Sequence, residues 1–152
     1  MSKQKIDQGQ YDENPSVWSA GGVVIKGTSE KYEVLLCVRN AQDLIALPKG
    51  KPNYGEDEIA AAIREVREET GIEVKIVQKV SEIFYSFINF GITINKKVTF
   101  FLMEMISGDI NDHDGEFDKV YWEKAEEALK MLTYQGERDV LEKAIKLVQN
   151  TG

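Results

Sequence analysis

Residues 50–72, GKPNYGEDEIAAAIREVREETGI, are the stretch that decides the fold. The segment from about Asp57 to Thr70 is predicted to be a helix, because acidic residues favour a first helical turn and Gly71 is typical of a C-terminal cap. Apolar residues recur inside it at helical spacing and form one stripe: Ile59, Ala62, Ile63 and Val66. Two prolines and two glycines within residues 47–56 indicate a loop before the helix.

The predicted helix also carries a cluster of carboxylates. Glu65, Glu68 and Glu69 stand at i, i+3 and i+4, so they share one side of the helix. Three ionised carboxylates this close repel one another unless a cation lies among them, and oxygen ligands alone favour Mg²⁺ or Mn²⁺. The cluster by itself also fits a solvated helix face, on which Arg64 and Arg67 are the partners.

The spacing of the whole stretch separates these two readings. It follows the pattern G-x5-E-x7-R-E-U-x-E-E-x-G-U, in which U is an aliphatic residue, and the chain therefore resembles the Nudix hydrolases. The resemblance extends across most of the chain and implies metal-dependent cleavage of a phosphoanhydride bond in a nucleoside polyphosphate. All seven fixed positions and both aliphatic positions match: Gly50, Glu56, Arg64, Glu65, Val66, Glu68, Glu69, Gly71 and Ile72.

The resemblance implies roles for the polar residues of this pattern. Glu65, Glu68 and Glu69 match the metal-binding and base-supplying glutamates, with Mg²⁺ as the cofactor and Mn²⁺ as a substitute. Arg64 and Glu56 match the pair that orients these carboxylates. Two further metal ligands are implied, the carbonyl oxygen of Gly50 and the side chain of Glu116. Water is the attacking group, so no protein nucleophile is needed.

The flanking sequence resembles the diadenosine tetraphosphate hydrolase branch, which cleaves its substrate asymmetrically to ATP and AMP. In that branch aromatic residues stack on adenine and lysines contact phosphates. The matching positions are Lys49, Tyr85, Lys97 (with Lys96 as the alternative) and Tyr134. Lys51 departs from the branch, which often has histidine there, but a lysine can still contact phosphate as a point charge. Two other substrates stay open: a nucleoside triphosphate removed from the nucleotide pool, and the 5′ end of an RNA that is decapped or loses pyrophosphate. The complete set of glutamates argues against a domain that only senses nucleotides.

The order of predicted elements indicates an α/β protein, with a mixed sheet between helices as in the α/β/α sandwich of the Nudix family. We expect strands over 19–26, 31–39, 73–80, 83–90, 97–106 and 119–122, an acidic loop over 109–118, and helices over 125–131 and 137–148. We interpret residues 1–16, which are polar, as a flexible lead-in, and residues 17–150 as one domain.

Composition excludes several classes of protein. The net charge of −7 disfavours general binding to RNA, and no apolar run approaches the roughly 20 residues of a membrane span. Cys37, the single cysteine, is expected in a buried strand, which suits a cytoplasmic setting. His113, the only histidine, is expected in a loop and excludes a zinc site built from several histidines. Nothing in the sequence indicates a protein partner.

Overall fold

The computed structural model describes residues 4–5 and 17–151. Most of the expected lead-in, residues 1–3 and 6–16, lies outside the described residues. The strands are β1 (Gln4–Lys5), β2 (Val17–Lys26), β3 (Glu33–Arg39), β4 (Leu44–Ala46), β5 (Lys49–Gly50), β6 (Ile72–Asn89), β7 (Ile92–Gly108) and β8 (Lys119–Lys124). The helices are α1 (Glu58–Thr70), α2 (Ala125–Met131) and α3 (Gln135–Thr151), with short 3-10 turns at Asn40–Gln42 and Ile110–Asp112.

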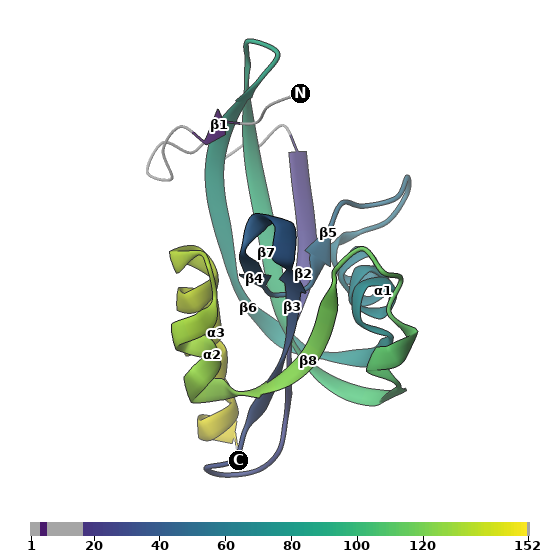
Figure 1. Ribbon diagram of the computed structural model, residues 1–152, viewed down its shortest axis with the longest axis vertical. Coiled ribbons are helices and arrows are strands. Elements are labelled where there is room, and N and C mark those ends of the chain that lie inside the picture. Colours follow the sequence, from purple (N-terminus) through teal and green to yellow (C-terminus); the bar gives the residue numbers. More distant parts are fainter. Residues whose placement is uncertain (1–3, 6–16, 152) are drawn as a thin grey trace.

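The strands form a mixed sheet with helices on either side (Figure 1). The order is β1-β6-β7-β2-β3-β4, with β5 paired to β2 and β8 paired to β3. The pairing of β2 with β7 is parallel, and the other pairings in the described chain are antiparallel. One hydrophobic core lies beneath α2 and α3 and contains Phe100 and Leu141, and a second lies beneath α1 and contains Val66 and Met103. The predicted α/β architecture is confirmed.

Helix α1 begins and ends close to where its sequence predicts. The Asp57 carboxylate accepts a hydrogen bond from the Ala60 N–H at 2.8 Å, which satisfies a backbone donor of the first turn. At the other end Gly71 has φ 81°, a left-handed conformation that favours glycine, and its N–H donates to Arg67 O. The buried stripe differs in part from the expected one, because Ile59 is 46% exposed whereas Ala61 is buried.

Several other elements differ from the sequence expectation, including β7, which was expected over 97–106 and spans Ile92–Gly108. The two strands expected over 73–80 and 83–90 form one 18-residue strand, β6. Register shifts between Ile76 and Gln78 and between Lys79 and Ser81 break its alternation, which makes one bent strand look like two in sequence. Residues 47–56, expected as a loop without regular structure, contain the two-residue strand β5. Helix α3 begins at Gln135, two residues before the predicted start.

The beginning of α3 is attached to β4 by hydrogen bonds. The Thr133 N–H donates to Ile45 O at 2.9 Å, and the Ile45 N–H donates to Thr133 Oγ1 at 2.8 Å. This attachment places the first turn of α3 beside the segment that runs from β4 into β5, and so beside the residues that precede α1. On β3, Cys37 is fully buried as expected, and burial raises the pKa of its thiol.

Candidate active site

The guanidinium group of Arg64 is the centre of a hydrogen-bond network on α1. Its Nε and Nη2 donate to the two carboxylate oxygens of Glu56 at 2.7 and 2.9 Å, a bidentate pair. Its Nη1 donates to Glu65 at 2.8 Å and to Glu68 at 2.9 Å, and Nη2 also reaches Lys51 O at 2.8 Å. Hydrogen bonding to Arg64 holds the pKa of Glu56 below its ordinary value. The predicted pairing of Arg64 with Glu56 is therefore present, and it positions two of the three clustered carboxylates.

Glu69 lies on the buried side of the cluster. Its side chain is only 3% exposed, and Oε1 accepts the backbone N–H of Lys49 on β5 at 3.0 Å. Burial, and next the charge of Glu65, raise the pKa of Glu69 to about 8. Burial likewise raises the pKa of half-buried Glu65. Both pKa values are raised chiefly by burial, which the Arg64 guanidinium beside Glu65 and the Lys49 N–H at Glu69 offset only in part.

Gly50 lies against the same carboxylates. A Cβ atom on residue 50 would overlap Glu65 Oε2, so glycine at this position leaves the Glu65 carboxylate where it lies. Because Lys49 binds Glu69 through its N–H and Gly50 lies against Glu65, two successive residues of β5 line the carboxylate cluster.

Glu116 approaches the cluster from the acidic loop between β7 and β8. The loop is attached to α1, since the Asp114 N–H donates to Glu68 O at 2.9 Å. Glu116 itself is exposed and forms an ion pair with Arg39 at 3.5 Å. Its charge is among the causes that raise the pKa of Glu69, which indicates that the two carboxylates are near each other.

The donor set fits a hard divalent cation. Glu65, Glu68, Glu69 and the Gly50 carbonyl offer only oxygen ligands, as Mg²⁺ and Mn²⁺ prefer. Within residues 4–5 and 17–151, no three acidic, histidine or cysteine side chains converge as a complete metal cage. Instead Arg64 holds Glu65 and Glu68, and the Glu68 side chain is 44% exposed. A cation beside Glu65 and Glu69 would favour the ionised form of both carboxylates, whose pKa values burial raises.

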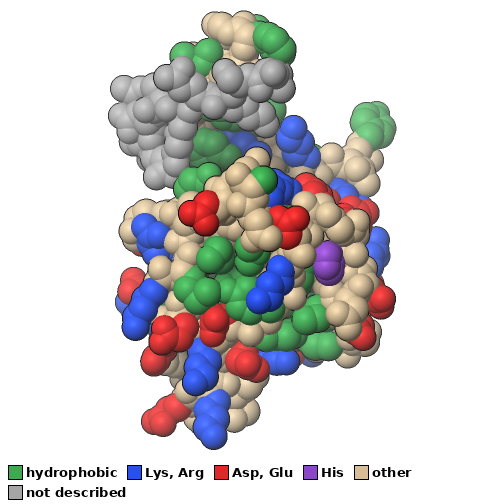
Figure 2. Space-filling model, in the orientation of Figure 1, with side chains coloured by type: hydrophobic (Ala, Val, Ile, Leu, Met, Phe, Trp, Pro, Cys, Tyr) green, Lys and Arg blue, Asp and Glu red, His purple; other side chains and the backbone are tan. Residues whose placement is uncertain are grey.

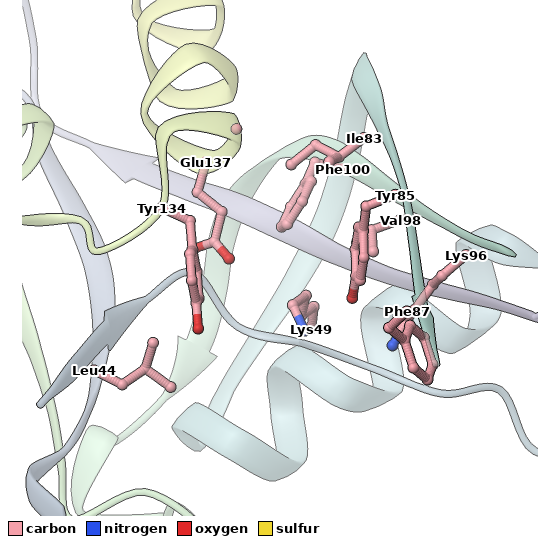
Figure 3. Close-up of a pocket in the computed structure, with 11 residues that line it drawn as sticks. Leu44, Lys49, Ile83, Tyr85, Phe87, Lys96, Val98, Phe100, Tyr134 and Glu137 are labelled. Carbon is pink, nitrogen blue, oxygen red and sulfur yellow. The ribbon is translucent and has the colours of Figure 1, made fainter. Parts of the chain in front are cut away.

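The side chain of Lys49 lines a pocket of about 290 Å³, whereas the backbone of Lys49 contacts the carboxylate cluster (Figure 3). Tyr85 from β6 and Tyr134 from the start of α3 stand on opposite sides of it, with Glu137 and Lys49 between them. Burial raises the pKa of the Tyr85 hydroxyl to about 12. The remaining lining is largely apolar: Leu44, Ile83, Phe87, Lys96, Val98, Phe100 and Gly136. Lys49 thus joins two places, with its backbone at Glu69 and its side chain in the pocket.

The predicted lysines are distributed differently. Lys96 lines the pocket, opposite Tyr85 in the antiparallel register. Lys97 points to the other face of the sheet, where it forms ion pairs with Glu58 at 3.1 Å and Glu82 at 3.7 Å. The structure therefore brings Lys96, the alternative, to the pocket. Lys51 is exposed, and its carbonyl binds Arg64.

Glu137 is a pocket residue that sequence reasoning missed. It is three residues after Tyr134, and since α3 begins at Gln135 the two side chains lie on the same side of the first turn. The three-residue spacing of Tyr134 and Glu137 could have indicated that both side chains line the pocket, but only if the start of the helix is known. The expected start at residue 137 hid it.

Comparisons with known proteins agree with this arrangement. A family model described as the NUDIX domain matches residues 16–144. Caenorhabditis elegans Ap4A hydrolase, solved as a binary complex, superposes with a TM-score of 0.71 at 26% identity, covering 88% of this chain and 98% of that one.

Two curated mycobacterial proteins are also similar in sequence. A Mycobacterium tuberculosis protein that carries the name mutator protein MutT4 is 35% identical over 136 residues, which are 86% of this chain and 55% of that protein. The 8-oxo-(d)GTP phosphatase of Mycolicibacterium smegmatis is 32% identical over 155 residues, covering 96% of this chain and 45% of that protein. This chain therefore spans about half the length of these two relatives.

Proposed function

This chain belongs to the Nudix family, and on that premise we propose that it hydrolyses a phosphoanhydride bond in a nucleoside polyphosphate. We further propose that the preferred substrate is diadenosine tetraphosphate, cleaved asymmetrically to ATP and AMP. One observation carries this choice. Tyr85 and Tyr134 face each other across a pocket that Lys49 joins directly to the buried carboxylate of Glu69.

The carboxylate cluster is the proposed reaction centre. Glu65, Glu68 and Glu69, together with the carbonyl of Gly50, would hold Mg²⁺ or Mn²⁺, with Glu116 as a further candidate ligand. The bound cation neutralises phosphate charge and polarises the phosphoryl oxygens. Arg64 keeps Glu65 and Glu68 in place while Glu56 keeps Arg64 in place. One carboxylate of the cluster takes a proton from the attacking water, which reaches phosphorus in line with the leaving phosphate.

The pocket is the proposed adenine site. Its volume of about 290 Å³ lies at the lower end of the range for ligand pockets, which suits one flat base. The rings of Tyr85 and Tyr134 provide faces for stacking, worth roughly 1–3 kcal/mol per base. A long polyphosphate carries several negative charges into a protein of net charge −7, so it needs cations along its path. Lys49 and Lys96, which line the pocket, are placed to supply them.

A second substrate class has a specific observation in its favour. The similarity to an 8-oxo-(d)GTP phosphatase supports removal of a modified nucleoside triphosphate from the nucleotide pool. The dinucleoside polyphosphate is preferred because the C. elegans Ap4A hydrolase is matched over nearly its whole length. The support for the 5′ end of an RNA as the substrate is weaker. On the face shown in Figure 2, acidic and basic side chains are interspersed around a hydrophobic area, without an extended basic patch among the described residues.

A substrate panel tests the proposal. The values of kcat/KM for diadenosine tetraphosphate, 8-oxo-dGTP and 5′-triphosphorylated RNA are measured under one condition with Mg²⁺, and products are resolved by chromatography. We expect diadenosine tetraphosphate to have the highest kcat/KM and to yield ATP and AMP. A higher kcat/KM for either of the other two would overturn the choice of substrate and leave the family assignment intact.

Replacing Tyr134 tests the stacking role. We expect Tyr134→Ala to raise KM for diadenosine tetraphosphate by about tenfold, with a smaller change in kcat, because the lost contact acts mainly in binding. Tyr134→Phe keeps the ring and should keep the KM within about threefold of wild type. The matched control is Phe90→Ala. Phe90 is an aromatic residue at the turn between β6 and β7 and is 79% exposed. An unchanged KM in Tyr134→Ala would remove Tyr134 from the substrate site.

The proposal includes the cellular compartment in which the protein acts. We propose that it works in the cytoplasm, since its single cysteine is buried in β3 and cannot form a disulfide within the chain. No helix among the described residues is long and apolar enough to cross a membrane.

A further inference from the structure

The pocket between Tyr85 and Tyr134 contains a carboxyl group that neither stacking nor phosphate binding explains. Glu137 is the one acidic side chain among the described residues that line it. Only 4% of Glu137 is exposed, and its neighbours in the lining are mostly apolar. A buried carboxyl group costs free energy unless hydrogen-bond donors reach it, so its presence in an otherwise apolar pocket requires a partner.

The backbone holds this carboxyl group in one orientation. Oε1 accepts the N–H of Leu47, which precedes β5, at 2.8 Å. The N–H of Glu137 in turn donates to Tyr134 O at 3.1 Å, within the first turn of α3. Oε2 receives no hydrogen bond from the part of the chain that the structure describes, and Figure 3 shows the carboxyl group directed into the space between Tyr134 and Lys49. The second oxygen is therefore available to a molecule in the pocket.

Burial raises the pKa of Glu137, while the Leu47 N–H and the charge of Lys49 favour its ionised form, and the chemistry of the bound molecule follows from that ionised carboxylate. It only accepts hydrogen bonds, so it favours an N–H donor and opposes a carbonyl oxygen. A flat ring between the two tyrosines would present its edge to Glu137. Adenine carries an exocyclic amino group at the edge of its ring system. Guanine carries such a group at a different ring position, and hypoxanthine carries none.

We propose that Glu137 is a specificity-determining residue, which accepts a hydrogen bond from the exocyclic amino group of a nucleobase held between Tyr85 and Tyr134. The inference rests on the proposed function, because it assigns a base to the pocket. It goes further by selecting bases that carry an exocyclic amino group over hypoxanthine, which lacks one. Lys49, which lines the same pocket, favours the ionised form of Glu137 and so opposes in part the effect of burial, which raises the pKa of Glu137.

Binding measured without hydrolysis tests this inference separately from the reaction. Dissociation constants of ATP, GTP and ITP, in forms whose phosphoanhydride bridging oxygens are replaced by methylene groups, are determined by calorimetry with Mg²⁺ present, for wild type and Glu137→Gln. Wild type should bind at least one amino-bearing nucleotide about tenfold or more tightly than ITP, since a site built to bind a donor rejects the analogue that lacks it. The ATP and GTP arms distinguish an adenine-type from a guanine-type amino group.

The variant should remove or reverse this preference. In Glu137→Gln the side-chain carbonyl can still accept the hydrogen bond from the Leu47 N–H. The amide NH₂ then faces the pocket as a donor. We expect the ratio of ITP to ATP dissociation constants to fall to about one or below. Glu142→Gln, an exposed glutamate on the same helix, is the matched control and should leave the ratio unchanged.

Two outcomes would overturn the inference. Equal binding of ATP, GTP and ITP by wild type would show that no amino group is read, and this result needs no variant. If Glu137→Gln weakens the binding of all three nucleotides equally, the residue only supports the backbone at Leu47. Hydrolysis is not part of the measurement. If turnover is absent while the binding preference is present, the proposed function fails and the role of Glu137 stands.

Discussion

Removal of divalent cations is expected to abolish turnover completely, and added Mg²⁺ or Mn²⁺ is expected to restore it. The physical reason lies in the charges of the site. Glu65 and Glu69 share one side of α1 with raised pKa values, and the substrate polyphosphate is itself an anion. Without a divalent cation the carboxylates and the polyphosphate repel each other, and the guanidinium of Arg64 is already engaged by Glu56, Glu65 and Glu68. Phosphate-bond cleavage is measured with EDTA, and then with a metal in excess over the chelator.

The control for this experiment is the fold itself. The thermal unfolding midpoint should stay within a few degrees of its starting value after chelation, because the helix caps, the Arg64 network and both hydrophobic cores are made by the chain alone. Full activity in chelator would contradict a metal-dependent mechanism. Loss of activity together with unfolding would instead assign the metal a structural role.

Neutralising any of the three clustered glutamates should lower kcat by at least about 100-fold. Glu65→Gln, Glu68→Gln and Glu69→Gln each remove a metal ligand or the group that accepts a proton from water, and such losses typically cost this much or more. The values of kcat and KM are measured with saturating Mg²⁺. Wild-type rates in all three variants would refute the site.

Stability separates a catalytic effect from a folding effect in this series. Each substitution removes one of several like charges, so the free energy of unfolding should not fall by more than about 1 kcal/mol. Glu142→Gln on the exposed face of α3 is the control for glutamate replacement and should leave kcat unchanged. Glu116→Gln should have a smaller effect than the three, because Glu116 is exposed and paired with Arg39.

The carboxylate half of the candidate site could be predicted from sequence because it is local. A helix places residues at i, i+3 and i+4 together whatever the rest of the chain does, so Glu65, Glu68 and Glu69 were predicted to form one cluster. The cap at Gly71 and the pairing of Arg64 with Glu56 also depend on residues within one short stretch, and both are present.

The pocket half could be predicted only in part. Tyr85 and Tyr134 were expected to act together, and they do line one pocket. Which lysine joins them depends on the face of β7, since successive strand residues point to opposite faces. The pairing of Tyr85 with Lys96 places Lys96 in the pocket and leaves Lys97 with Glu58 on the other side of the sheet.

By itself, then, the sequence determined the helix, its caps and the carboxylate cluster, because these arise from spacing along one element. Only the tertiary structure decided how the chain joins this cluster to a pocket. Strand register selected Lys96, the close approach of β5 to α1 placed Gly50 against Glu65, and the attachment of α3 to β4 brought Glu137 to Leu47, 90 residues away. Contacts between residues this far apart depend on packing and register, which no local pattern encodes.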